Sequence, residues 1–340
     1  MRVPGGRQNM APHLIIGWTI RSAGLALIAV CTLASAQTPT TDNYPSRAIR
    51  FVLPTAVGSG SDVLGRVIAH QMSINLGQPV VPDNRPGAAG VIGVTAVKNA
   101  PPDGYTIVFG NLSSIVNAPL LGDPPPYDPL KDFDPVALVY KSVLILAWNE
   151  PGSGTTLAEL IEHARKHRGK LNYSSAGPGS YAHLWIEMLK HRLGIDMVHI
   201  PYKGAGPAFQ AILTGEVQFS LAETAVAGAA SASSMKVIVQ LGEQRSPTYP
   251  NIPTVREAGY PELTSDFWFG ALAPRGTPPR IVQRLNEELN KVMASPEVRS
   301  RVAAAGGEAI AADPATFAKQ IAKDHAQWAP VVTQLGLKGK

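Results

Sequence analysis

The sequence has almost no cysteine and little charge. Cys31 is its single cysteine, so a folded chain of this length has to be held together by a hydrophobic core and not by disulfides. Charged residues make up 16% of the chain and hydrophobic residues 45%, which is the composition of a folded globular protein and excludes a disordered one. The 340 residues are enough for two domains.

The chain also lacks an excess of positive charge in its main body. The formal net charge is +5, but Arg2, Arg7 and Arg21 all lie within residues 1–36, a segment that holds no acidic residue. Removing these three arginines leaves 27 basic residues against 25 acidic ones. Phosphate binding needs a clustered basic surface, so this balance excludes nucleic acid as the main partner.

Long hydrophobic runs are missing beyond the first 36 residues. The longest later runs, such as Val143–Trp148, have only the length of a strand. We therefore expect a protein that is not membrane-integral once it has been processed.

Residues 1–36 have the pattern of a signal peptide. Arg21 precedes an apolar run from Ala23 to Leu33, and the small residues Ala34-Ser-Ala36 follow it. We expect cleavage near Ala36 and export to the periplasm. Two alternatives stay open, namely an uncleaved anchor helix and a lipoprotein modified at Cys31.

Short strand-like runs alternate with helical patterns along the rest of the chain. The first series has strands near 48–53, 79–81 and 105–109, with helices near 61–77 and 87–97 between them. A second series begins after the proline-rich stretch at 124–129; its helices lie near 157–167, 180–193 and 208–213, and its strands near 171–174, 197–200, 217–221 and 237–241. This alternation predicts an α/β protein with parallel strands and two lobes.

The chain ends in two amphipathic helices that no strand follows. One apolar stripe consists of Ile281, Leu285, Leu289 and Val292, and a second begins at Phe317 and ends at Val332. Such helices have to pack on a sheet that already exists. We expect that sheet to be the first one, so the chain would leave the first lobe and return to it.

A glycine-rich turn follows one strand in each series. The first turn is Val57-Gly-Ser-Gly-Ser-Asp62 and the second is Ser174-Ser-Ala-Gly-Pro-Gly-Ser180. Turns of this kind, at the start of a helix, offer free N–H groups and the positive end of the helix dipole to an anion. Two such turns facing each other across a cleft would suit a ligand with two acidic ends, although either turn alone is also explained as a simple helix cap.

The signals for an enzyme or a metal site are weak. Ser180 and His183 are three residues apart at a helix start, but no Gly-x-Ser-x-Gly elbow occurs. His163 and His167 have the spacing of metal ligands on a helix, but their basic neighbours would repel a cation. We expect no catalytic residue, no metal and no cofactor, with a secreted α/β hydrolase or isomerase as the alternative function.

Several motifs, in order along almost the whole chain after residue 44, give the sequence a resemblance to a known family. The motifs are Tyr44-Pro-Ser-Arg-Ala-Ile-Arg50, Asn84-Arg-Pro-Gly87, Pro102-Asp-Gly-Tyr-Thr106, Asp128-Pro-Leu-Lys-Asp-Phe133, Gly169-Lys-Leu-Asn172, Gly179-Ser180 with His183-Leu184, Val198-His-Ile-Pro-Tyr-Lys-Gly204 and Leu272-Ala-Pro-Arg-Gly-Thr-Pro278. In them the sequence resembles the solute receptors of tripartite tricarboxylate transporters, the Bug family of extracytoplasmic binding proteins.

The resemblance implies a type II periplasmic-binding-protein fold. Two α/β lobes would be joined by two crossover strands, with lobe 1 at 44–142 and 266–340 and lobe 2 at 143–265. A small carboxylate would bind in the cleft between the lobes and be passed to membrane transporter subunits or to a signalling partner. We expect the receptor to be a monomer.

The resemblance and the two turns together give the expected ligand-binding residues. They are Val57, Gly58, Ser59, Gly60, Asn111, Ser113, Ser114, Ser175, Gly177, Gly179, Ser180, His183, Tyr202, Lys203, Ala222 and Glu223. Ser113 and Ser114 are equally open to a helix-capping role.

The sequence departs from the family pattern at two places. The family's first turn usually reads Pro-Gly-Gly, whereas Val57-Gly-Ser59 stands here and adds a hydroxyl. Ala222 stands where the family often has an aspartate that meets a ligand amino group. This favours a plain carboxylate over an amino acid, unless the adjacent Glu223 takes the place of that aspartate.

Overall fold

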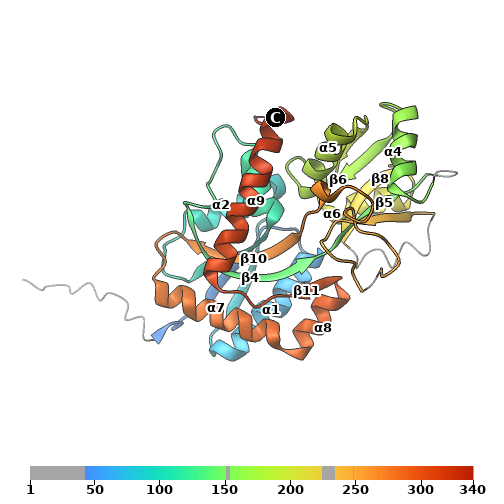
Figure 1. Ribbon diagram of the computed structural model, residues 1–340. Coiled ribbons are helices and arrows are strands. Elements are labelled where there is room, and N and C mark those ends of the chain that lie inside the picture. Colours follow the sequence, from blue (N-terminus) through green and yellow to red (C-terminus); the bar gives the residue numbers. More distant parts are fainter. Residues whose placement is uncertain (1–42, 151–153, 224–233, 248, 340) are drawn as a thin grey trace, which may run out of the picture. The chain divides into compact units, whose positions relative to one another are not determined.

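The computed structural model describes residues 43–150, 154–223, 234–247 and 249–339 (Figure 1). The expected signal peptide and the cleavage site near Ala36 lie outside the described residues. Within the described ranges, no helix is long and apolar enough to cross a membrane.

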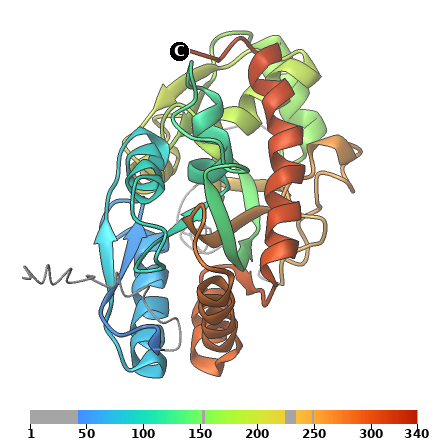
Figure 2. The same ribbon diagram turned by 90° about the vertical axis from the view of Figure 1, so that its left-hand side faces the viewer.

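The described strands form two sheets, and the first has six strands. Its strands are, in spatial order, β11 (Gly307–Ala309), β4 (Phe133–Ser142), β10 (Phe267–Pro274), β3 (Thr106–Asn111), β1 (Ile49–Leu53) and β2 (Val80–Asn84). As expected from the first series, β1 pairs in parallel with both β2 and β3. β1 (blue) and β2 (cyan) lie side by side in Figure 2.

The first sheet is not entirely parallel, as the alternation of strands and helices had predicted, but mixed. β10 is antiparallel to both β3 and β4, and the sequence patterns had assigned neither β4 nor β10. Every residue of β10 is buried, so its side chains show no alternation between apolar and polar faces. A short apolar segment of this kind cannot be told from a buried helix segment by periodicity.

Helices cover both faces of the first sheet (Figure 1). On one face lie α1 (Gly60–Leu76), α7 (Pro279–Ala294) and α8 (Pro296–Ala304), which contact one another. The other face is covered by α2 (Val91–Lys98) and α9 (Pro314–Gln334). Both α7 and α9 contact β4, so the C-terminal helices return to the first sheet as their apolar stripes predict. The expectation that no strand follows these helices is wrong, because the short strand β11 lies between α8 and α9 and pairs with β4.

Short helical segments complete this part of the chain. They are η2 (Ala88–Gly90), the π-helical segment η3 (Ser113–Asn117) and α3 (Ala118–Leu120). η3 follows β3 directly and contacts both η2 and α9. It therefore lies at the edge of the sheet where β3 ends.

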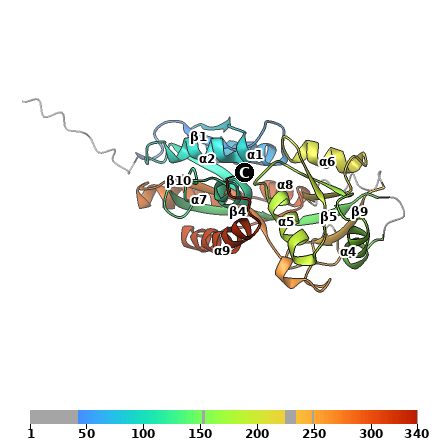
Figure 3. The same cartoon turned by 90° about the horizontal axis from the view of Figure 1, so that it is seen from above.

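The second sheet has five strands. They are, in spatial order, β7 (Val198–Pro201), β6 (Asn172–Ser175), β8 (Phe219–Glu223), β5 (Leu144–Trp148) and β9 (Lys236–Gln240). β6 pairs in parallel with β7 and β8, whereas β5 is antiparallel to β8 and β9. Its helices are α4 (Leu157–Lys166), α5 (Tyr181–Leu193) and α6 (Ala205–Leu213), close to the expected ranges, and η5 (Pro261–Leu263) follows β9. Figure 3 shows α6 and α4 on opposite sides of this sheet.

Two stretches of chain connect the sheets. β4 belongs to the first sheet and ends at Ser142, while β5 belongs to the second and begins at Leu144. The chain returns between β9 and β10. The predicted lobe boundaries at 142/143 and 265/266 fall in these connections and stay a prediction.

Candidate functional site

The expected ligand-binding residues gather at the carboxyl ends of parallel strands. In the first sheet the loops after β1 and β3 carry 57–60 and 111–114. In the second sheet residues 175–183 run from the end of β6 into the first turn of α5, residues 202–203 follow β7, and β8 ends at Glu223. The carboxyl ends of neighbouring parallel strands share one edge of a sheet, which is where open α/β sheets bind ligands.

The two edges touch each other through the segment that follows β3. Ser113 Oγ accepts a hydrogen bond from the backbone N–H of Tyr181 at 2.9 Å. A Cβ atom on Gly179 would lie 3.2 Å from Ala118 Cα. Among the described residues, no hydrogen bond joins the first turn to the second. The structure therefore joins 113–118 to the second turn directly, and places the first turn on the same edge as 113–118 through the pairing of β1 with β3.

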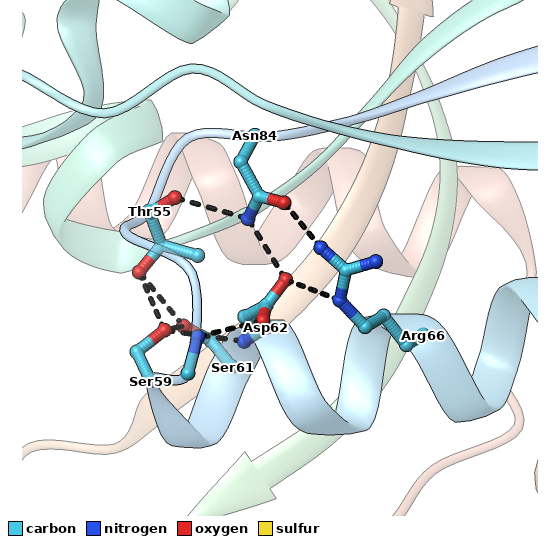
Figure 4. Close-up of polar contacts among 7 residues, drawn as sticks. Thr55, Ser59, Ser61, Asp62, Arg66 and Asn84 are labelled. Atoms are coloured by element: carbon cyan, nitrogen blue, oxygen red, sulfur yellow. Dashed lines mark hydrogen bonds and ion pairs between the residues drawn. The ribbon is translucent and has the colours of Figure 1, made fainter.

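The first turn is exposed and leads into α1 (Figure 4). Val57 is 72% exposed, and a Cβ atom on Gly58 or Gly60 would meet no atom within 4 Å. Ser59 is the N-cap of α1, because its Oγ accepts from the backbone N–H of Asp62 at 3.2 Å. The hydroxyl expected to face a ligand is thus also a helix cap.

Hydroxyl groups cluster beside this turn. Ser59 Oγ lies 2.8 Å from Thr55 Oγ1 and 3.3 Å from Ser61 Oγ, and Ser61 Oγ donates to Thr55 Oγ1 at 3.2 Å. Hydroxyl protons rotate, so these groups can donate either to one another or to an oxygen that enters the turn.

Asp62 holds the first turn from beneath (Figure 4). Its side chain is 2% exposed and accepts from Gly58 N–H at 2.8 Å, Arg66 Nε at 2.9 Å and Asn84 Nδ2 at 2.8 Å. Burial alone would raise the pKa of Asp62, but these three hydrogen bonds outweigh it and hold the pKa below its usual value. Asp62 is not among the residues expected to bind a ligand, and its one signal in the sequence is an acid at the third helical position.

The second turn is buried, and most of its hydrogen-bonding groups are paired with other groups of the protein. Ser175 Oγ accepts from Gly177 N–H at 3.1 Å, and Ser180 N–H donates to the Gly177 carbonyl at 3.1 Å. Ser180 is the N-cap of α5 and accepts from His183 N–H at 3.4 Å. Gly179 N–H donates to His183 Nδ1 at 3.2 Å. Most N–H groups of this turn therefore already have partners.

Two histidine rings stack beneath the second turn. The rings of His183 and His199 are 4.2 Å apart and nearly parallel, and Tyr173 stacks on the other face of His199 at 4.8 Å. His199 Nε2 lies 2.6 Å from Ser175 Oγ. Burial is the main cause that lowers the pKa of His199 to about 4 and the pKa of His183 below 6.5, so both rings are neutral at pH 7.

The residues after β3 mostly serve the local backbone. Asn111 Oδ1 accepts from Ser114 N–H at 3.0 Å, and Ser114 Oγ accepts from Asn111 N–H at 3.1 Å. Ser114 lies inside η3, and the N-cap residue Leu112 has no side-chain capping hydrogen bond, so a capping role for Ser114 stays a prediction. Asn117, which the sequence analysis did not place in the site, is fully buried, and neither of its side-chain amide atoms has a hydrogen-bond partner in the described part of the chain.

Ala222 and Glu223 point to opposite faces of β8, as neighbours in a strand do. Ala222 is buried in an apolar cluster with Ile145 and Phe209. Glu223 pairs with Leu144 at the connection between the sheets, and burial raises the pKa of Glu223 to about 7 while the nearby Ser142 lowers it in part. Of the two, Glu223 has the environment of a functional carboxyl.

Tyr202 and Lys203 follow β7 and flank the second turn. Tyr202 N–H donates to the Ser175 carbonyl at 2.9 Å, and its hydroxyl donates to Glu216 at 2.7 Å. Lys203 is exposed. Their contact with a ligand stays a prediction.

The histidines with metal-ligand spacing are used differently. His163 Nε2 lies 2.8 Å from a carboxylate oxygen of Glu150, and the rings of His163 and His167 stack at 4.2 Å. Across the described residues, no group of three or more His, Cys, Asp or Glu side chains could hold a metal ion.

Comparisons with known proteins agree with this architecture. Residues 64–337 match the family model of the tripartite tricarboxylate transporter family receptor. Protein BugT of Bordetella pertussis is 35% identical over 315 residues, which cover 92% of this chain and 97% of that protein. The structure of MatC from Rhodopseudomonas palustris with bound malate has a TM-score of 0.78 at 32% identity, covering 85% of this chain and 100% of that one. An R. palustris protein solved with adipate has a TM-score of 0.79 at 30% identity, covering 86% and 98%.

Proposed function

The chain belongs to the tripartite tricarboxylate transporter family of receptors, and on that basis we propose that it captures a small organic carboxylate between the carboxyl edges of its two sheets. It presents the acid unchanged to transporter subunits in the membrane or to a signalling partner. The bound malate and adipate of the two similar structures, both dicarboxylates, support this chemistry.

The observation that carries the proposal is the open first turn. Gly58 and Gly60 face free space, and the N–H groups of Gly60 and Ser61 have no hydrogen-bond partner in the described residues. They stand at the start of α1, a helix of 17 residues. Unpaired N–H groups at the positive end of a helix favour a carboxylate.

The second half of the site belongs to the start of α5. Ala182 N–H is unpartnered among the described residues, and Ser113 lies beside it through its hydrogen bond with Tyr181. A ligand that contacts both half-sites stabilises the arrangement in which they are close together, so binding shifts the receptor toward its closed form.

The location and the partners follow from the same proposal. The signal-peptide pattern of residues 1–36 supports export to the periplasm with cleavage near Ala36. A receptor of this kind acts as a monomer that meets transporter subunits after loading. It needs no metal and no cofactor.

The alternative function, a hydrolase, would need a serine activated by a histidine. The two serine–histidine pairs near the second turn are both unsuited to nucleophilic catalysis. Ser180 Oγ bonds the backbone N–H of His183, whose ring nitrogen Nδ1 already accepts from Gly179. Ser175 is closer to a histidine ring, but it is 1% exposed, and a pKa of about 4 makes His199 a weak base at neutral pH.

Thermal-shift and calorimetric titrations test the proposal. Malate, succinate and adipate are compared with their diamides, and each acid is analysed by NMR after incubation with the protein. At least one acid should raise the melting temperature and be recovered unchanged. Its diamide should bind about 2–5 kcal/mol more weakly, the range for truncating one partner of a charged contact. Equal affinity for the acid and its diamide would contradict an anion-binding site. Consumption of the acid would show that the protein is an enzyme.

A further inference from the structure

Both turns carry the same local arrangement, although their sequences differ. In each, a glycine with positive φ precedes an N-cap serine: Gly58 (φ 82°) before Ser59, and Gly179 (φ 77°) before Ser180. The serine hydroxyl accepts from the backbone N–H three residues later. The side chain of that same residue accepts the N–H of the glycine, at 2.8 Å in the first turn and 3.2 Å in the second.

We propose that Asp62 and His183 are matched positioning residues of the two half-sites, each fixing the glycine of its turn so that the next N–H groups face the ligand. This inference rests on the proposed function and deepens it. In an ordinary capping box the third helical residue bonds the N-cap N–H, whereas here the bond goes one residue further back, to the glycine.

These bonds separate the N–H groups that hold the turn in place from those that can bind a ligand. Because the glycine N–H is held by a side chain, it is not available to a ligand. Among the first three residues of α1 and of α5, and within the described residues, the N–H groups left without a partner are those of Gly60, Ser61 and Ala182. A turn that already has its bound geometry loses less entropy when the ligand arrives.

Contacts outside the turn hold Asp62 in place. Asn84, at the end of β2, donates to Asp62 Oδ1 and also to the Thr55 carbonyl at 3.2 Å (Figure 4). Arg66, one helical turn further along, donates to Asp62 Oδ1 and to Asn84 Oδ1. The acceptor of Gly58 is thus tied to α1 through Arg66 and to the end of β2 through Asn84, which also bonds the loop after β1 at Thr55. This is more than a helix cap needs.

His183 is held by a different set of groups. It is 7% exposed and stacks on His199, which stands on β7 and stacks in turn on Tyr173 of β6. On its own helix the charged groups that face it are Glu187 and Lys190, which are bonded to each other at 2.7 Å. To accept from Gly179, the Nδ1 atom of His183 must carry no proton.

This requirement makes the second half-site sensitive to acid. A proton on Nδ1 of His183 turns an acceptor into a donor that faces the Gly179 N–H, and the added charge stacks against His199. The bond that fixes the turn is then lost. Asp62 is an anion with its pKa held low, so the first half-site keeps its bond over the same pH range.

Four variants separate positioning from general packing. Asp62→Asn and His183→Asn keep an oxygen acceptor for the glycine, whereas Asp62→Leu and His183→Leu remove it. Calorimetry with malate and adipate at pH 7 should find His183→Asn within about threefold of the wild type and the two leucine variants weaker by about fivefold or more, the effect of one lost hydrogen bond. Asp62→Asn should lie between the wild type and Asp62→Leu, because its amide NH2 would face the donors of Arg66 and Asn84. Circular dichroism confirms folding at the temperature of titration.

The pH profile provides a measurement that a purely structural role would not change. Wild-type affinity should fall more steeply than that of His183→Asn between pH 7.5 and 4.5, with a difference that approaches about fivefold once His183 is protonated, the effect of the one lost hydrogen bond. His191→Asn is the matched control, since His191 stands on the same helix and bonds Gln334 instead of the turn. Its profile should follow the wild type.

The outcomes distinguish this inference from the proposed function. If the wild type binds neither malate, succinate nor adipate, the proposed function fails and the inference falls with it. If the wild type binds one of them but His183→Asn shows the same pH profile, or the asparagine variants lose as much affinity as the leucine variants, the positioning role is overturned. Should the leucine variants not fold, the asparagine variants and the pH profiles decide.

Discussion

Gly179 and Gly58 form a natural pair for measuring the contact between the two edges. Both have positive φ, 77° and 82°, so an alanine at either position strains the backbone in the same way. Their surroundings differ: a Cβ atom on Gly58 meets nothing within 4 Å, whereas on Gly179 it would lie 3.2 Å from Ala118 Cα and 3.4 Å from Leu121 Cδ2. Gly58→Ala therefore reports strain alone, and Gly179→Ala reports strain plus a steric conflict.

The expected magnitudes follow from these surroundings. A left-handed conformation costs a residue with a Cβ atom about 1–2 kcal/mol, so both variants should lose roughly that much free energy of unfolding. Overpacking against a backbone atom adds about 1–3 kcal/mol, and this applies to Gly179→Ala only. The difference between the two variants isolates the contact of the second turn with Ala118.

Urea denaturation of the ligand-free protein measures these losses, and titration with malate or adipate measures binding. Because the Cβ atom of Gly179→Ala pushes the second turn away from 118–121, we expect that variant to bind about tenfold more weakly than the wild type, equivalent to about 1.4 kcal/mol. Equal unfolding free energies for the two variants, together with unchanged affinity of Gly179→Ala, would refute the contact.

Three further predictions concern Glu223, Asn117 and Ala222. Folded Glu223 keeps its proton up to about pH 7, whereas the unfolded chain releases it near pH 4.5, so the folded state binds more protons in that window and stability falls as the pH rises. Glu223→Gln should remove up to about 3 kcal/mol of this decline. If the wild type and the variant lost the same unfolding free energy between pH 5 and pH 8, the prediction would be contradicted. Asn117→Leu replaces an unpartnered buried amide by an apolar side chain of similar size and should stabilise the ligand-free protein by about 1 kcal/mol in thermal unfolding; a loss of stability would show that the amide has a partner. Ala222→Asp places a carboxylate in the apolar cluster with Ile145 and Phe209 and should lower the unfolding free energy by about 3 kcal/mol or more. Ala222→Ser is the control and should lower it less. An unchanged unfolding free energy for Ala222→Asp would mean that this side chain faces the cleft and not the apolar cluster.

The sequence determined the local elements of this protein because their signals are local. Hydrophobic periodicity located α7 and the first three strands, and glycine followed by serine marked the starts of α1 and α5. The motifs also sufficed to identify the family. In each case the physical cause, an apolar stripe or a cap, lies within a few consecutive residues.

The assembly of the site depends on contacts between segments that are far apart in the sequence. β10 was missed because all of its residues are buried, and its antiparallel place between β3 and β4 depends on pairing with segments more than a hundred residues away. The acceptors of the two glycines had no signal of their own, since an acid or a histidine at the third helical position is common. Their role arises from Asn84 and His199, which reach Asp62 and His183 from other strands, and only the folded chain brings those strands together.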